Sequence, residues 1–267
     1  MRFIPVILIA VILASCGGSM TKLLKNPDPE YKLRMAEQYF VKKKYSKAQL
    51  LYEDVMPHFK TGKEFENIYY KYAYCAYYQE DYFNAENLFK TFLEIFPNSA
   101  RSEEIAYMRA YSFYKQSPKP ELDQTNTVKA MGMMQTFINT HPGSQRNKEA
   151  NDIIDICRQK LEIKDHQGAQ LYYDMGHFRA AGVSFETLLD NYPESVKADE
   201  YKLMVIKSFF RYAELSIEDR QHERYEEVIA KVNEFIDRFP DSKLRKEAEE
   251  YLKQSQTNIK NLDNEQT

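Results

Sequence analysis

Four proline-containing segments of similar sequence recur along the chain at nearly constant spacing. Pro97, Pro142, Pro193 and Pro240 lie 45, 51 and 47 residues apart, and each is followed two residues later by serine. Proline lacks the N–H that would extend a helix, and it biases the preceding residue away from the helical region. Serine is a favoured N-cap. Each segment therefore predicts that one helix ends, a tight turn follows and another helix begins.

The residues before each proline form an apolar stripe with helical spacing. Apolar side chains stand five and eight positions before each proline, and a small residue stands twelve positions before three of the four. This spacing places them on one helix face, and a small residue lets a neighbouring helix approach. The preceding helices carry matching small residues at Ala36, Ala73, Ala110 and Ala169. The pattern resembles the second helix of a tetratricopeptide repeat, and it predicts an all-α solenoid of about five helix pairs.

The repeat sets the expected organisation. We expect helix pairs at about residues 30–60, 64–97, 102–142, 165–193 and 196–240, and a C-terminal capping helix at 243–261. Three insertions are expected: a loop at 116–126, a bridging helix at 145–164 and a loop at 218–223. The predicted domains are 30–142, with the first three repeats facing a substrate, and 143–263, with the bridging helix, the last two repeats and the capping helix docking to a scaffold.

The N-terminus is predicted to direct localisation rather than to fold. Arg2 precedes an apolar run of 11 residues, which is too short to span a membrane as a helix. Small residues then lead into Cys16, as in the bacterial lipobox, whose cysteine is lipidated and becomes the first mature residue. We expect residues 1–15 to be a cleaved signal peptide, Cys16 the lipidation site and 16–29 a tether. An ordinary signal peptide with a chance cysteine is the alternative.

Composition excludes several classes of function. The formal charge is −3, so no net basic field indicates nucleic-acid binding. No phosphate-binding glycine loop, metalloprotease motif or nucleophile motif is present, so neither an enzyme nor a cofactor beyond the covalent lipid is expected. Cys75 and Cys157 are expected to be buried thiols, although a disulfide between them stays open.

Tyrosines on two first helices are the candidate binding residues. Tyr69 and Tyr72 fall at expected packing positions, whereas another set lies at i, i+4, i+7 on a face that lines the groove of tetratricopeptide repeats. Its members are Tyr70, Tyr74 and Tyr77 in the second repeat and Tyr107, Tyr111 and Tyr114 in the third. Leu33, Glu37 and Phe40 occupy the same places in the first repeat. Tyrosine suits a half-exposed recognition surface, so these ladders predict a groove for an extended peptide. Burial by neighbouring helices is the alternative.

The chain resembles the BamD family of outer membrane assembly lipoproteins. The similarity includes the signal peptide, the lipobox cysteine, Tyr72-Ala73-Tyr74, Tyr107-Met108-Arg109 and the Tyr172-Tyr173 and Gly176 positions. The resemblance implies a non-enzymatic scaffold, held by its lipid at the periplasmic face of the outer membrane. It also implies that the first repeats receive unfolded outer-membrane proteins and that the last repeats dock to a BamA-like β-barrel protein.

Several residues acquire roles through this resemblance alone. Arg109 would pair with the substrate's terminal carboxylate, or else pack structurally. The docking surface would comprise Tyr172, Tyr173, Met175, Gly176 and Phe178, where Met175 replaces an arginine common in the family. The competing classes are an envelope or peptidoglycan-linked repeat adaptor and a glycan-binding repeat lipoprotein. The short distance from Cys16 to the first repeat disfavours the adaptor, and the modest length disfavours the glycan binder.

Overall fold

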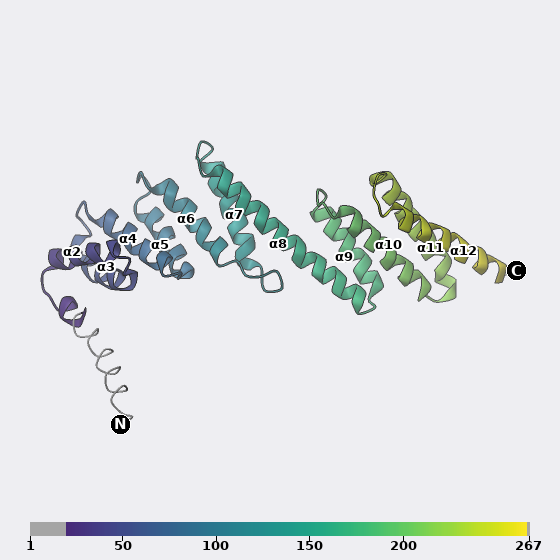
Figure 1. The fold of residues 1–267 in the computed structure, drawn as a ribbon, viewed down its shortest axis with the longest axis horizontal. Coiled ribbons are helices and arrows are strands. Elements are labelled where there is room, and N and C mark those ends of the chain that lie inside the picture. Colours follow the sequence, from purple (N-terminus) through teal and green to yellow (C-terminus); the bar gives the residue numbers. More distant parts are fainter. Residues whose placement is uncertain (1–19, 266–267) are drawn as a thin grey trace, which may run out of the picture. The chain divides into compact units, whose positions relative to one another are not determined.

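The structure is a computed structural model, and it describes residues 20–265 (Figure 1). The predicted signal peptide and Cys16 lie outside the described residues. The described chain is helical, with paired helices following one another along the sequence. The helices are α2 (Pro29–Val41), α3 (Tyr45–Phe59), α4 (Phe65–Tyr78), α5 (Tyr82–Ile95), α6 (Ser102–Lys115), α7 (Thr125–Thr140), α8 (Asn147–Asp174), α9 (Phe178–Asn191), α10 (Ala198–Glu214), α11 (Glu218–Arg238) and α12 (Arg245–Glu265). This arrangement confirms the predicted all-α fold of tetratricopeptide-type helix pairs.

The described chain forms two compact units. Unit 1 contains residues 20–118 and 123–157, and unit 2 contains residues 119–122 and 158–265. The division falls within α8, between Cys157 and Arg158, and not at residue 142 as expected from the sequence. Unit 1 has two clusters of buried apolar residues, one centred on α2–α4 and one on α4–α8, and unit 2 has one.

The apolar stripes form the cores of both units, as predicted. The residues five, eight and twelve positions before each proline are buried, with Phe92, Phe89 and Ala85 as the example in α5. The small residues of the first helices, Ala36, Ala73, Ala110 and Ala169, are buried too. Sequence periodicity therefore identified the packed face of each pair.

The serines after the prolines have a different role from the expected one. Ser99 is not the N-cap of α6, because Arg101 occupies that position. The Ser99 hydroxyl accepts the Arg101 N–H (3.0 Å) and donates to Glu66 Oε1 (2.7 Å), which lies at the start of α4. Equivalent bonds join Ser144 to Glu103, Ser195 to Glu162 and Ser242 to Asp199. We call these four bonds serine clasps, because each ties the end of a helix pair to its beginning.

Helix α8 corrects the prediction of a separate bridging helix. It runs without a break from Asn147 to Asp174, so the expected bridging helix and the first helix of the fourth pair are one element. The clasp acceptor is the second residue of α4, α6 and α10, but Glu162 lies in the middle of α8. The fourth repeat thus begins inside a continuous helix. Without proline at that point, nothing in the local sequence stops the helix.

Two expected irregular segments are helical. Residues 218–223 were expected to form a loop, but α11 begins at Glu218, and Glu218 and Asp219 lie favourably in its first turn. Residues 20–24, within the expected tether, are helical as well. Leu23 is buried in the core formed by α2 and α3. The helical residues 20–24 of the expected tether therefore belong to unit 1.

Candidate binding surfaces

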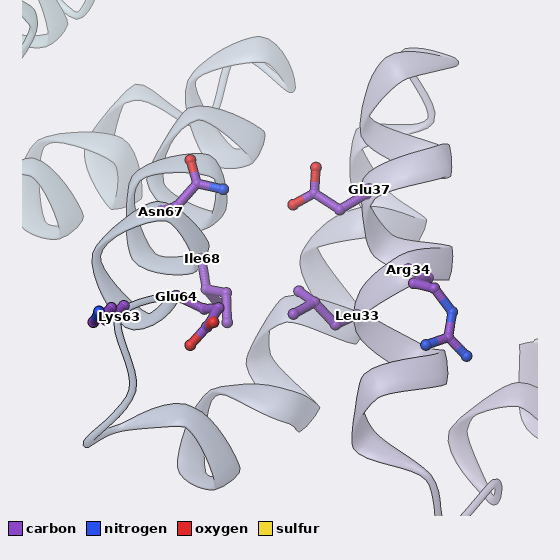
Figure 2. A pocket seen from close by; sticks show the side chains of 7 residues that line it. All are labelled: Leu33, Arg34, Glu37, Lys63, Glu64, Asn67 and Ile68. Atoms are coloured by element: carbon purple, nitrogen blue, oxygen red, sulfur yellow. The ribbon is translucent and has the colours of Figure 1, made fainter.

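A pocket of about 380 Å³ lies between the first helices of the first two pairs (Figure 2). Leu33 of α2 and Ile68 of α4 face each other across it, and Glu37 and Asn67 face each other one turn further along. Its lining comprises Leu33, Arg34, Glu37, Lys63, Glu64, Asn67 and Ile68. The pocket therefore combines an apolar base with amide and charged groups, and its volume suits one large side chain.

The polar groups of this pocket are held by neighbouring helices. Glu37 accepts hydrogen bonds from the Tyr52 hydroxyl (3.0 Å) and from the Lys71 ammonium group. Asn67 Oδ1 accepts from Arg101 Nη2 (3.2 Å), and the Arg101 guanidinium stacks on the Tyr70 ring at 4.2 Å. Burial raises the pKa of Tyr52, and the nearby Glu37 carboxylate raises it further. The pocket is thus preorganised, with carboxylate and amide groups fixed before any ligand arrives.

The tyrosine ladders are only partly surface features. Tyr74 and Tyr107 are 6% and 2% exposed, so the prediction that they present side chains to a groove is wrong. Four other members are half-buried: Tyr70, Tyr77, Tyr111 and Tyr114. Ring contacts connect them across two helices, with Tyr77 and Tyr111 at 6.4 Å. The alternative of burial by neighbouring helices therefore holds for two of the six tyrosines.

A carboxylate from the next repeat binds two of these tyrosines. The Tyr70 hydroxyl donates to Glu104 Oε1 (2.9 Å), and the Tyr74 hydroxyl donates to the same oxygen. Burial, reinforced by this carboxylate, raises the pKa of Tyr70 to about 12 and also raises the pKa of Tyr74. These tyrosines therefore remain neutral hydrogen-bond donors that join α4 to α6.

Arg109 has a structural partner. Its Nε donates to Glu86 Oε1 (2.8 Å), and the Glu86 side chain is almost completely buried in α5. A buried carboxylate needs such a partner. Of the two roles expected for Arg109, the structure supports packing, because the guanidinium already neutralises a carboxylate of the same unit.

In unit 2, an open groove of about 720 Å³ follows the turn between α8 and α9. It collects three of the predicted docking residues, namely Tyr172, Gly176 and Phe178. Met175 is 59% exposed beside them, and Tyr173 packs edge-on against Phe178 at 5.2 Å. Gly176 has φ +77°, a conformation that favours glycine, so it sets the turn that presents these side chains.

Sequence reasoning missed part of both surfaces. The groove is also lined by His177, Arg179, Ala180, Val183, Ser184 and Tyr212. Val183 is half exposed although it lies on a packed helix, and Tyr212 comes from α10, where no motif marked it. In the unit 1 pocket, Asn67 and Ile68 were missed. They could have been found from their position, because they lie in α4 opposite Leu33 and Glu37. Those two residues were already placed on the groove face of the first repeat by their spacing in the sequence.

Paired helices, buried stripes and a pocket between first helices together define a tetratricopeptide-repeat protein. Residues 28–218 match the family described as YfiO, outer membrane lipoprotein. Because this match covers most of the chain, the protein belongs to that family of outer membrane lipoproteins. No helix among residues 20–265 is long and apolar enough to cross a membrane.

A curated relative supports the same grouping. The chain is 24% identical over 193 residues to the "Putative outer membrane protein assembly factor BamD" of Aquifex aeolicus (strain VF5). The match covers 72% of this chain and 62% of that relative.

Solved structures of repeat proteins are also similar. A TPR repeats protein from Bacteroides fragilis NCTC 9343 is 13% identical with a TM-score of 0.41, covering 88% of this chain and all of that one. The yeast Sti1 TPR2AB domain, from a complex with pHSP90, is 10% identical with a TM-score of 0.41, covering 90% of this chain and all of that one.

Proposed function

We propose that this protein is a non-enzymatic scaffold of outer membrane protein assembly, anchored by lipid on Cys16 at the periplasmic face of the outer membrane. Family membership and the assembly role named for the Aquifex relative support the process. The observation that carries the proposal is that each compact unit has its own open surface, the pocket in unit 1 and the groove in unit 2. A scaffold that joins a substrate to a partner needs two such surfaces.

The pocket of unit 1 is the proposed substrate site. An extended segment of an unfolded outer-membrane protein would place an aromatic side chain between Leu33 and Ile68. Lys63 and Arg34, at the rim, are the cations for a terminal carboxylate, because Arg109 is already paired with Glu86. The half-buried tyrosines Tyr70, Tyr77, Tyr111 and Tyr114 are proposed to extend this surface along the first helices.

The groove of unit 2 is the proposed docking site for a BamA-like β-barrel protein. Tyr172 and Met175 expose apolar surface beside Phe178, and Arg179 adds a positive charge at the edge. Aromatic and methionine side chains with an arginine are typical of the energetically dominant part of protein interfaces. Since Met175 replaces the family's common arginine, this contact is proposed to be apolar rather than a salt bridge.

Site-specific photocrosslinking tests the substrate site. A photoreactive residue at Leu33 is expected to crosslink peptides that correspond to the C-terminal segments of outer-membrane barrels. Ile68→Asp should abolish this crosslinking, but it also places a charge in the core. Asn67→Ala, at the polar side of the pocket, provides a milder variant. Crosslinking that both variants leave unchanged would contradict the substrate site.

Purification from solubilised membranes tests docking and anchoring. A BamA-like barrel is expected to copurify with the wild type and not with Tyr172→Ser/Met175→Ser. Cys16→Ala should change the processing and membrane attachment of the chain while the helical content of residues 20–265 is retained. Normal levels of assembled barrels after depletion would refute the assembly role and support the envelope adaptor.

A further inference from the structure

We propose that one edge of unit 1 rests on a bilayer surface rich in anionic phospholipids. This basic edge consists of Val41 at the end of α2, Lys42, Lys43 and Lys44 in the α2–α3 turn, and Phe83 at the start of α5. The inference rests on the lipid-anchor part of the proposed function and concerns a different surface from the pocket and the groove. It would make the lipid on Cys16 one of two attachments to the membrane.

Ring and amide contacts hold the two turns of the basic edge side by side. Tyr78, at the end of α4, stacks on Tyr45 at 4.6 Å and meets Phe40 edge-on at 6.3 Å. Gln79 Nε2 donates to Gln49 Oε1 (2.5 Å) across the same junction. The end of α4, which leads into Phe83, is therefore fixed against the α2–α3 turn within one unit.

The basic edge combines exposed apolar side chains with exposed positive charge. Val41 and Phe83 are 78% and 72% exposed, and the three consecutive lysines are exposed as well. The turn is well ordered by backbone bonds, because the Lys43 N–H donates to Phe40 O (2.9 Å) and the Lys44 N–H to Tyr39 O (2.8 Å). Basic residues beside exposed apolar groups are the combination that binds the interface of a membrane.

The charge of these lysines is available for a partner. Within residues 20–265, no carboxylate lies within ion-pair distance of Lys42, Lys43 or Lys44, whereas Lys32 of the same helix pair contacts Asp54 at 2.6 Å. The neighbouring α4–α5 turn carries two acidic residues, Glu80 and Asp81, and Asp81 caps α5 by accepting the Asn84 N–H. Within the basic edge, the positive charge therefore comes from the α2–α3 turn, whereas the α4–α5 turn is acidic.

The excess of basic over acidic residues extends over the whole first helix pair. Residues 20–60 contain nine lysines and arginines against five aspartates and glutamates, whereas the complete chain has 37 against 40. An acidic protein thus concentrates positive charge in the pair that is nearest to its predicted lipidation site. Complementarity to anionic headgroups accounts for this distribution.

The length of the chain holds this pair near the bilayer. Four residue steps separate Cys16 from Met20, and they reach at most about 14 Å when fully extended. Leu23 is packed in the same apolar cluster as Ala36, Ala48 and the partly buried Phe40 and Tyr45. A lipid anchor on Cys16 therefore restrains the basic edge to a small volume beside the membrane, which raises its effective concentration there.

A fluorescent label on the basic edge tests the proposal. The lipidated full-length protein carrying Val41→Cys is labelled with an environment-sensitive fluorophore and added to vesicles. The native thiols of Cys75 and Cys157 are both buried, which protects them from labelling. A blue-shifted emission and quenching by lipid-linked quencher are expected on three-to-one phosphatidylcholine–phosphatidylglycerol vesicles and not on pure phosphatidylcholine. Both signals should disappear in about 1 M salt, where the Debye length is ~3 Å.

Charge reversal supplies the matched comparison. Lys42→Glu/Lys43→Glu/Lys44→Glu is expected to reduce lipid contact of the label at least about tenfold. Lys243→Glu/Lys246→Glu, at exposed positions in the α11–α12 turn and at the start of α12 in unit 2, should leave it unchanged. A label on Val196→Cys, which is 96% exposed in unit 2, should report no lipid contact. An equal signal on both vesicle types, an unaffected triple variant, or an equal signal at position 196 would each overturn the proposal.

Vesicle flotation separates this proposal from the anchor. If the chain fails to float with pure phosphatidylcholine vesicles, this result contradicts the lipid anchor but not the basic edge. In that case, the basic edge is supported if the chain floats with anionic vesicles and the triple variant does not. A chain that floats equally with both vesicle types, without any shift of the label at position 41, supports the anchor and overturns the basic edge.

Discussion

Both units join tyrosine hydroxyls to carboxylates of another helix, but they differ in the aromatic side chains at their candidate surfaces. In unit 1, where tyrosines are most frequent, hydroxyls of Tyr70 and Tyr74 meet a carboxylate of the next repeat, and the rings join neighbouring helices. In unit 2, by contrast, Tyr172 and Met175 remain 45% and 59% exposed beside an open groove. A high local frequency of tyrosine thus indicates packing between repeats as readily as recognition. The partners of the hydroxyl groups decide between the two.

Truncation of Tyr74 should have the largest effect on stability. Tyr74→Ala removes a buried ring and is expected to destabilise unit 1 by about 3–5 kcal/mol. The matched change in unit 2 is Tyr172→Ala, at the exposed groove. It should lower the free energy of unfolding by less than ~0.5 kcal/mol. Hydrogen exchange followed by mass spectrometry measures each unit separately. Equal protection of unit 1 in both variants would show that Tyr74 is not a core residue.

Removal of the shared carboxylate should have an intermediate effect. Glu104→Gln keeps the size of the side chain but weakens two charge-assisted hydrogen bonds, with an expected loss of roughly 1–3 kcal/mol. Glu30→Gln is the control, since Glu30 contacts Arg34 only at 4.0 Å on the surface. Urea denaturation gives both values. If the two variants unfold at the same midpoint, Glu104 does not join α4 to α6 as described.

A pH effect is expected in unit 2. The hydrogen bond from Lys202 lowers the pKa of Glu234 below its ordinary value of 4.5, so the unfolded chain is protonated at this residue before the folded one. The pair therefore stabilises the protein above pH 4.5, and this contribution is lost as the pH falls through the lowered folded pKa. Because Glu234 is mostly exposed, the effect should stay below ~1 kcal/mol. Thermal melting at pH 7 and pH 3 should show it in the wild type. The difference between wild type and Glu234→Gln should shrink at pH 3, and a constant difference would contradict it.

The exposed surface of the groove should be the least sensitive to mutation. Tyr172→Ser/Met175→Ser is expected to change the stability of unit 2 by less than ~0.5 kcal/mol, because both side chains face solvent. Gly176→Ala provides the contrast, since its φ of +77° is strained for any residue with a side chain. Differential scanning calorimetry measures both. A large loss for the double variant would mean that these side chains belong to the core.

Periodicity in the sequence was sufficient for the fold but not for the surface. The prolines marked four helix ends, because proline affects the backbone locally, and the stripes ending in Phe92 or Phe235 identified the buried faces. The continuity of α8 was missed, because a repeat boundary there is not marked by any helix-breaking residue. The Tyr74 ring packs on Phe89 of α5, and its hydroxyl binds Glu104, 30 residues away. Neither is encoded in the spacing along one helix.

The serine clasps also bear on how such a chain can change in length. Their partners are 33, 41, 33 and 43 residues apart, yet each joins the turn after the second helix to the point where its repeat begins. That point is the start of the first helix in three pairs and the middle of α8 in the fourth. Residues added between those points, such as the loop from Gln116 to Gln124, leave the junction with the next repeat as it was. Each repeat therefore behaves as a closed module of adjustable size. Insertions can accumulate inside it while the register of the following helices is preserved.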